Sequence, residues 1–211
     1  MGPVTLEIVA LFLSVNGLLC VILTSSLPLW KVPAFQGANL VTAQQTWEGL
    51  WMDCVWQDTG EMVCNTFDSM LILGQELQVA RALSTTAGVL GALGILTSIA
   101  GASWTRLVQG EPCKARLLCA AACSLLLTGI LQLIPVAWTA NGIVRDFHSQ
   151  SVPEGVKREL GPSLYIGMGA TALFTAASGL LWFSCYRFRA RAGPRTDYSP
   201  GQTSYSESHH V

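Results

Sequence analysis

Charged side chains are scarce in this sequence. Only 12% of its 211 residues are Asp, Glu, Lys or Arg, whereas a soluble globular domain carries about 25%. The net charge is −1, and no basic cluster is dense enough to bind nucleic-acid phosphates, so a nucleic-acid partner is excluded. With 51% hydrophobic residues and a mean hydropathy of +0.44, the composition instead predicts a membrane protein that contacts lipid.

The motifs of catalytic and metal centres are missing as well. The sequence has no glycine-rich phosphate loop, no Cys-x-x-Cys pair and no His-Glu-x-x-His zinc motif. Two adjacent histidines, His209 and His210, stand in a polar tail, where we expect them to bind no metal. The sequence therefore predicts a protein that is not an enzyme and uses no cofactor.

Four long uncharged stretches have the length that a bilayer requires, which is about 20 residues per helix. The predicted spans are residues 8–27, 82–103, 117–136 and 163–184. None of these ranges contains Asp, Glu, Lys, Arg or His, the residues that mark the pathways of transporters and pumps. We therefore expect no ion route through the protein's own helix bundle.

The first span is also compatible with a cleaved signal peptide, because the small residues Thr24, Ser25 and Ser26 stand near its end. Its apolar run is longer than that of a typical signal peptide, however, and no Lys or Arg precedes it. A retained first helix is the preferred interpretation.

Basic residues predict the orientation, since loops rich in Lys and Arg stay in the cytoplasm. The short loop 104–116 holds three of them, and the tail 187–211 opens with four more. The two long loops, 28–81 and 137–162, hold only five over a much greater length. We therefore expect both termini and the short loop in the cytoplasm, and the two long loops outside the cell.

The seven cysteines divide into groups once this topology is assumed. Cys54 and Cys64 are the two that fall in the outer loops, where an oxidising environment favours a disulfide between them. Cys113 and Cys185 stand at the cytoplasmic border, where S-palmitoylation is an option, chiefly at Cys185. The others lie in predicted spans, where a thiol acts as a small apolar side chain.

The sequence between the outer cysteines predicts a β-hairpin. The turn Asp58-Thr59-Gly60 fits a three-residue loop closed by a glycine. This turn pairs Trp56 with Met62 and Cys54 with Cys64, so the two cysteines lie directly opposite each other. Turn chemistry and cysteine spacing therefore agree on one register.

Alternation along the strands divides the hairpin's side chains between two faces. One face is apolar and is expected to pack, and it consists of Cys54, Trp56, Met62 and Cys64. The other is expected to meet water, with Val55 and Val63 among four polar residues, which are Asp53, Gln57, Glu61 and Asn65. The whole 28–81 loop has six acidic and two basic residues, so this surface is predicted to be acidic.

Helical spacing recurs outside the hairpin. Apolar residues in segment 69–81 follow a helical period and predict a short outer helix that leads into the second span. Small residues at helical spacing in the second and fourth spans predict close packing within one bundle, in preference to dimerisation. These small residues are Gly88, Gly91, Ala92, Gly94, Ser98, Gly167, Gly169, Ala170 and Gly179.

Taken in order along the chain, the outer loop contains a W…GLW…C…C pattern followed by an arginine, and its residues are Trp30, Gly49, Leu50, Trp51, Cys54, Cys64 and Arg81. This pattern resembles the signature of the claudin family. The similarity covers residues 1–186. The tail 187–211 lies outside it and is expected to be disordered.

The resemblance implies an α+β membrane protein with a left-handed four-helix bundle and an extracellular antiparallel sheet of about five strands built from both outer loops. It implies a plasma-membrane protein of the tight junction that polymerises within one membrane and binds itself or other claudins across adjacent cells. The resulting paracellular barrier would be selective for size and charge, with the ion path between outer loops. The alternative is an auxiliary or adhesion protein of the same fold that regulates a channel or receptor and forms no strands.

The resemblance also implies roles for single residues. Asn65 matches a position that is acidic in some cation-pore claudins and lysine in some barrier or anion-leaning ones. With Asp53 and Glu61 it forms the set of candidate pore residues, and the two acids would make the pore lean toward cations. The alternative within the family is a pure barrier, in which the acids are paired or solvated.

Further assignments concern assembly and partners. The residue that inserts into a neighbouring subunit and the two that line its receiving pocket correspond to Met70, Phe147 and Leu160. The chain ends in His210-Val211 where the family usually has Tyr-Val, but a free carboxylate can still bind a PDZ domain of a zonula occludens scaffold. Residues 149–153 depart from the Asn-Pro-Leu-Val-Ala motif associated with Clostridium perfringens enterotoxin, so strong toxin binding is not expected.

Overall fold

The structure, a computed structural model, describes residues 3–34, 45–56, 60–67, 74–108, 110–148 and 157–191. These residues form four helices and one sheet of five strands. The helices are α1 (Pro3–Ser26), α2 (Gln75–Gly101), α3 (Glu111–His148) and α4 (Pro162–Arg191). The strands are β1 (Lys31–Pro33), β2 (Gln45–Glu48), β3 (Met52–Trp56), β4 (Met62–Thr66) and β5 (Arg158–Leu160).

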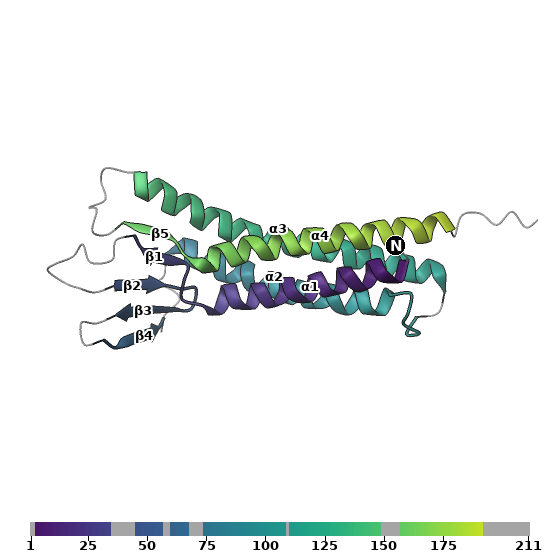
Figure 1. The fold of residues 1–211 in the computed structure, drawn as a ribbon, viewed down its shortest axis with the longest axis horizontal. Helices are drawn as coiled ribbons and strands as arrows, with labels where there is room; N and C mark the ends of the chain where they lie inside the picture. The colour runs from purple at the N-terminus through teal and green to yellow at the C-terminus, as the bar shows by residue number, and fades with distance from the viewer. Residues whose placement is uncertain are drawn as a thin grey trace, which may run out of the picture.

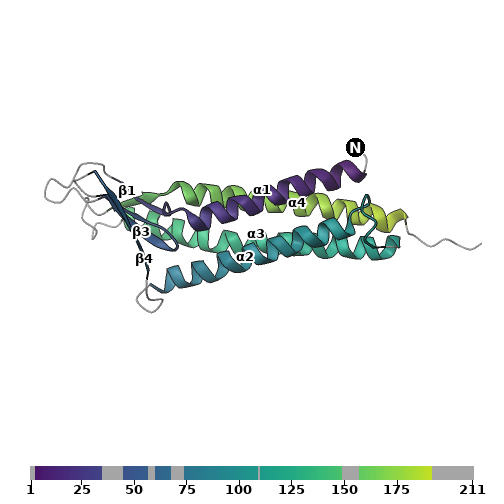
Figure 2. The ribbon, with the colours of Figure 1, turned by 90° about the horizontal axis from the view of Figure 1, so that it is seen from below.

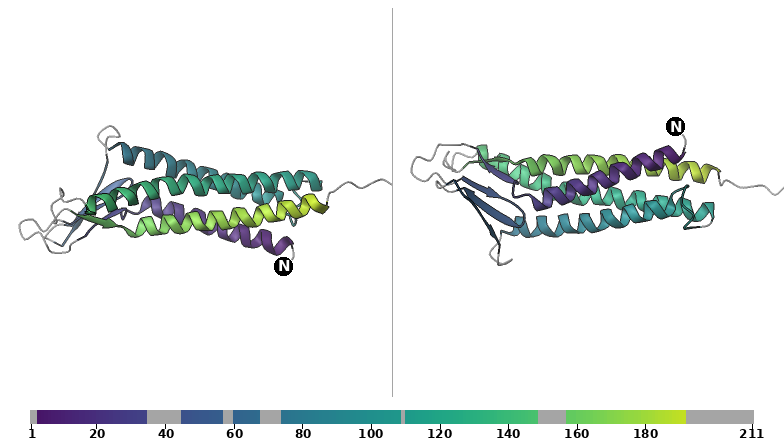
Figure 3. Two further views of the ribbon diagram at one scale, coloured as in Figure 1. Left: turned by 90° about the horizontal axis from the view of Figure 1, so that it is seen from above. Right: turned by 60° about the horizontal axis from the view of Figure 1, so that its bottom comes forward.

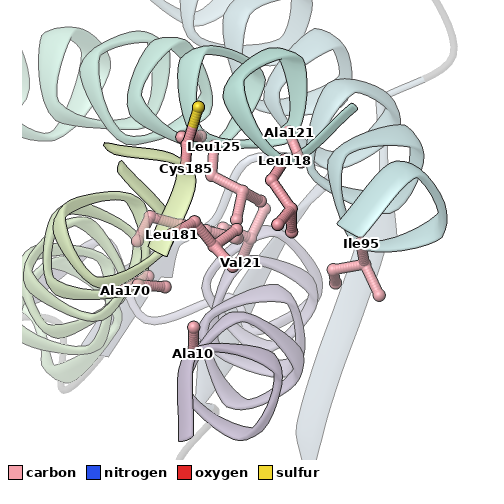
Figure 4. Packing of buried hydrophobic residues seen from close by; sticks show 12 residues of the cluster. Ala10, Val21, Ile95, Leu118, Ala121, Leu125, Ala170, Leu181 and Cys185 are labelled. Carbon is pink, nitrogen blue, oxygen red and sulfur yellow. The ribbon is translucent and has the colours of Figure 1, made fainter. Parts of the chain in front are cut away.

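The helices run side by side as one bundle, and each is long and apolar enough to cross a membrane (Figures 1 and 2). In the bundle α2 packs mainly on α3, α3 on α4, and α4 on α1. Apolar side chains from all four helices meet in the main core, and Figure 4 shows Val21, Ile95, Leu118 and Leu181 converging between the ribbons. Because α1 contributes to this core, it is an integral part of the bundle, as a retained first helix would be.

Small residues set the distance between α2 and α3. A Cβ atom on Gly94 would lie 2.7 Å from the Oγ of Ser124 and 2.8 Å from Cδ2 of Leu125, so a larger residue would require these two side chains to shift. Gly88 and Gly169, by contrast, face open space. The predicted close packing therefore holds for some of the small residues, while others lie on the outside of the bundle.

All four helices are longer than the predicted spans, and α4 continues to Arg191 in the predicted tail. Residues 137–148 were expected to belong to an outer loop, but they continue α3 as far as His148. They stay helical because Ile143 packs into a second core beneath the sheet and no proline follows Pro135 before residue 153. At the other end of the bundle, α1 begins before residue 8 and so includes Glu7, whose side chain is buried.

The sheet lies at one end of the bundle, and the N-terminus and the connection between α2 and α3 lie at the opposite end (Figures 1 and 3). Its strand order is β4-β3-β2-β1-β5, all antiparallel, so the second outer loop supplies the strand at one edge. The second core joins the sheet to the helices, and its buried members are Trp30, Leu50, Ala80, Val136, Ile143 and Leu164. The predicted architecture of four helices under a five-stranded sheet is confirmed.

Candidate functional site

The β3–β4 hairpin has the register that the sequence predicted. Trp56 lies opposite Met62 and Cys54 lies opposite Cys64, and the cysteines form a disulfide. Gly60 has a φ of +80°, the conformation that closes a three-residue hairpin loop. The conformation of Gly60 and the disulfide therefore fix the hairpin in the same register.

The prediction that the hairpin has one packed and one solvated face is wrong in two respects. Cys54 is fully buried, but Trp56 and Met62 on the same face are 41% and 45% exposed. On the opposite face, Asp53 is only half-exposed. The reason is that β4 is an edge strand with every residue exposed, and no other described segment of the chain covers it.

Asp53 belongs to a polar row that crosses the sheet. The strand pairings place Lys31 opposite Glu48, and Glu48 opposite Asp53. Asp53 in turn lies opposite Asn65 on the edge strand. Because directly opposed residues share a face, these four side chains lie in line on the same surface.

Two cations hold Glu48 in this row. The Nζ of Lys31 lies 3.7 Å from Oε2 of Glu48, and the guanidinium of Arg158 forms an ion pair with Oε1. Arg158 reaches the row from β5, where it lies opposite Pro33, two residues along β1 from Lys31 and so on the same face. All three side chains are between a fifth and a third exposed, so solvent screens these pairs only in part.

The carboxylate of Asp53 has a less favourable environment than that of Glu48. Its Oδ1 is buried and has no hydrogen-bond partner among the described residues. Burial, with a smaller contribution from Glu48, raises the pKa of Asp53 above the usual range, while Arg158, Lys31 and Arg81 oppose the shift. The row thus places two carboxylates beside two cations, and its formal charge is close to zero.

The base of the hairpin is fixed to the bundle by a buried arginine. Arg81 of α2 is 5% exposed, and its Nε donates a hydrogen bond to the carbonyl of Leu50 at 2.5 Å. Its guanidinium also stacks on two rings, 4.9 Å from the centre of Trp51 and 5.2 Å from that of Phe67. The arginine therefore links the first outer loop to a membrane helix.

Two other residues of the predicted signature have structural roles at the same junction. Trp30 is buried and donates its indole N–H to the carbonyl of Thr24 at 2.7 Å. Gly49 lies against the backbone of Pro28 so closely that a Cβ atom would collide with it. The signature residues thus form a rigid support beneath the sheet.

Comparisons with known proteins agree with this geometry. Residues 4–182 match the model of the PMP-22/EMP/MP20/Claudin family. The chain is 49% identical to claudin-9 of Mus musculus over 201 residues, which cover 94% of this chain and 93% of the relative. It is 46% identical to claudin-3 of Rattus norvegicus, with 95% and 89% covered, and 43% identical to claudin-4 of Homo sapiens, with 98% and 95% covered.

The chain belongs to the claudin family. It is a multi-pass membrane protein with four candidate spans, and the family gives it a role at the tight junction. Its nearly full coverage of these claudins extends beyond the signature to the helices and both outer loops.

This claudin has a hollow of about 220 Å³ between the end of α3 and β5. Phe147 and Leu160, predicted as a receiving pocket, both line it, together with Ile143 and Val144. The Nζ of Lys157 lies 5.4 Å from the centre of the Phe147 ring. The structure thus brings the two predicted residues together, whereas Met70 lies outside the described residues.

Glu61 and the two cysteines predicted as palmitoylation candidates are separate from the row. Glu61 is exposed just before β4, and none of its contacts within the described residues joins it to Asp53. Cys185 is 2% exposed, and its thiol donates a hydrogen bond to the carbonyl of Ala115. This burial disfavours acylation of Cys185, whereas Cys113 is exposed. The tail residues His210 and Val211, as well as His209 and the segment 149–153, lie outside the described residues.

The sequence interpretation did not identify three members of the polar row. Lys31, Glu48 and Arg158 were visible as loop charges, but nothing local showed that they meet. The signal that could have found them is strand pairing, since extending the hairpin register across β2 places Glu48 beside Asp53. The short strands β1 and β5 gave no periodicity from which to extend it further.

Proposed function

We propose that this claudin polymerises into tight-junction strands and seals the space between adjacent cells as a barrier with little charge preference. Its partners are other copies of itself and other claudins, in the same membrane and across the junction. The basic residues Arg106, Lys114 and Arg116 lie at the end of the bundle opposite the sheet, which supports a cytoplasmic location for that end and for both termini.

The exposed edge of the sheet supports assembly. Among the described residues, no strand pairs with the outer side of β4, and an unpaired edge is a template for another chain. The apolar side chains of Trp56, Met62 and Val63 are each more than 40% exposed around it. A second copy docked here would cover this apolar surface, which no described segment of the chain covers.

The hollow beside β5 supports a second contact between neighbouring subunits. Apolar side chains form most of its exposed lining, although His148, Arg158 and Glu159 also border it. It lies at the outer end of the bundle, where a neighbour in the same membrane can reach it. We infer that Phe147 and Leu160 receive an apolar side chain there, and Met70 of the adjacent copy is the candidate. Two further roles are proposed from the family pattern. Glu61 is a candidate pore-lining residue, and the carboxyl end at Val211 is a candidate ligand for a PDZ domain.

The observation that carries the barrier proposal is the balance of positive and negative charges in the polar row, which we call the compensated row. An acidic surface would concentrate cations only if its charges were unpaired and lined a narrow path. Here Glu48 is paired with Lys31 and Arg158, and Asp53 is half-buried beside them. Asn65, at the edge of the row, adds no charge. The row therefore favours a barrier over the cation-leaning pore that the acidic loop suggested.

Two measurements test this proposal. Freeze-fracture of fibroblasts that express the full chain should show continuous strand networks, and their absence would instead support an auxiliary or adhesion protein of the same fold. Dilution potentials across an epithelial layer lacking its own claudins should show raised resistance and no preference between Na⁺ and Cl⁻. Asp53→Asn leaves the row with one excess positive charge and should shift this ion ratio toward Cl⁻. A native Na⁺ preference that falls to none in that variant would establish an acidic pore instead.

A further inference from the structure

A hollow of about 570 Å³ opens at the end of the bundle opposite the sheet. It lies between the α2–α3 connection, the beginning of α3 and the end of α4. Its main lining residues are Ser103, Trp104, Thr105, Arg106, Lys114 and Phe188. This surface is separate from the sheet and from the subunit contacts proposed above.

The side chains of the hollow favour an anion. Arg106 is exposed, and its guanidinium has no hydrogen-bond or ion-pair partner among the described residues. Lys114 is half-buried and donates to the carbonyls of Thr105 at 2.7 Å and Ser103 at 3.5 Å, which leaves a third N–H available. Gly110 also lines the hollow and precedes α3, so the positive end of that helix dipole opens toward it.

One acid contacts this loop from the core side and is already occupied, while Glu111 is the first residue of α3. Glu7 accepts hydrogen bonds from the backbone N–H of Ser103 at 2.8 Å and from its Oγ at 2.7 Å. It lies on the core side of the loop, 3% exposed, and it is not part of the lining of the hollow. Its carboxylate therefore holds the loop in place and forms no described ion pair with Arg106 or Lys114.

Apolar residues place the hollow at the membrane surface. Trp104 is 50% exposed at its rim, and Leu107, in the same connection, is 74% exposed. Tryptophan is enriched at the level of lipid headgroups, and an exposed leucine beside it can enter the acyl region. An anion that reaches Arg106 and Lys114 from the bilayer would be a lipid headgroup.

We propose that this hollow binds the headgroup of a multiply phosphorylated phospholipid of the inner leaflet. The proposal rests on the cytoplasmic location of this end of the bundle given under the proposed function. Two cations and a helix N-terminus around one hollow suit a group with more than one phosphate better than a singly charged headgroup. The bound lipid would tie the α2–α3 connection to the end of α4.

Substitution of Arg106 tests lipid binding without removing a contact that supports the fold. Lys114 has a second role, because it binds carbonyls that follow the end of α2, and its loss can disturb the fold. Arg106 has no such contact, so Arg106→Gln should leave the fold intact. The matched control is Arg116→Gln, which removes the same charge from an exposed position near the start of α3, outside the hollow.

The experiment measures lipid binding to the purified full chain in detergent by native mass spectrometry. The probes are phosphatidylinositol bisphosphate, phosphatidylserine, phosphatidylcholine and soluble inositol trisphosphate. We expect the bisphosphate lipid to bind in preference to the other probes, and Arg106→Gln to weaken it about fivefold, the effect of one basic side chain near a charged surface. Arg116→Gln should change it less than twofold, which is smaller than one such contribution.

Three results would overturn the proposal. Equal losses in the two arginine variants would mean diffuse attraction to a basic surface. Equal binding of phosphatidylserine and the bisphosphate lipid would mean that the hollow does not recognise the headgroup, and soluble inositol trisphosphate bound as tightly as the lipid would mean an anion site that needs no membrane. Strand formation and ion selectivity are measured separately in cells, so failure here leaves the proposed function standing, and the reverse also holds.

Discussion

Asp53 is a residue whose charge the fold disfavours. One of its oxygens is buried without a hydrogen-bond donor among the described residues, and Glu48 lies beside it. Burial raises the pKa of Asp53, so the folded protein holds the proton of this carboxyl more tightly than the unfolded chain does. The stability that comes from this difference is present at acid pH and is lost as pH rises through the raised pKa.

We predict that Asp53→Asn stabilises the protein at neutral pH. The amide removes a partly buried charge, and the melting temperature in detergent should rise by a few degrees at most, because solvent screens a half-exposed group. The gain should shrink as pH falls toward about 4, where the carboxyl of the native residue is protonated. The exposed acid Asp146, changed to Asn, serves as the control and should show no such dependence on pH. A destabilised Asp53→Asn variant at neutral pH would mean that the carboxylate makes a favourable contact.

Arg81 is predicted to be costly to remove, because it links the base of the sheet to α2. Arg81→Ala loses a charged hydrogen bond and two ring contacts, and should reduce the free energy of unfolding by about 2–4 kcal/mol. Arg81→Lys should recover only part of this, because an ammonium group cannot bind Leu50 and also lie flat over both rings. Denaturant unfolding in mild detergent measures both, with the exposed Arg145→Ala as control. Equal stability of Arg81→Ala and the native chain would show that the linkage is not needed.

Among the elements, the hairpin was predictable and the row beside it was not. The register of β3 and β4 followed from a glycine turn and two cysteines, all within eleven positions of one another. The row combines residues 31, 48 and 158, which meet only through pairings between distant segments, and a local pattern does not reveal such pairings. The extension of α3 through residues 137–148 was also not predicted. These residues are too polar for a membrane span, and tertiary contacts hold them in the helix.

Helix packing gives a prediction at the same scale. Gly94→Ala adds a methyl group within 3 Å of two atoms of α3, and this overpacking should destabilise the bundle by about 1–3 kcal/mol. Gly88→Ala adds the same methyl group on the same helix, where nothing lies within 4 Å, and should be neutral or slightly stabilising. Thermal unfolding of the two variants in one detergent compares them directly. If both lower stability equally, glycine is needed for a reason other than the contact with α3.

The whole molecule separates its functions along one axis. The sheet, with its compensated row and its exposed edge, lies at one end, and the basic hollow lies at the other. Between them, the signature residues and Arg81 fix the sheet to the helices. The membrane helices thus hold the sheet in a fixed orientation. Under the proposed function, the ion path would pass between the sheets of neighbouring copies, and the balance of charges in the row would set the selectivity of the seal.

The measurement that tests this balance most directly is the dilution potential of Arg158→Gln in an epithelial layer lacking its own claudins. Removing Arg158 leaves Glu48 with one partner, so the row becomes negative and the Na⁺ preference should rise about two- to fivefold over the native chain. Arg145→Gln, which removes a cation outside the row, should not change it, and freeze-fracture should show strands in all three layers. A native chain that already prefers Na⁺, or an Arg158→Gln variant with normal strands and an unchanged ion ratio, would contradict the compensated barrier.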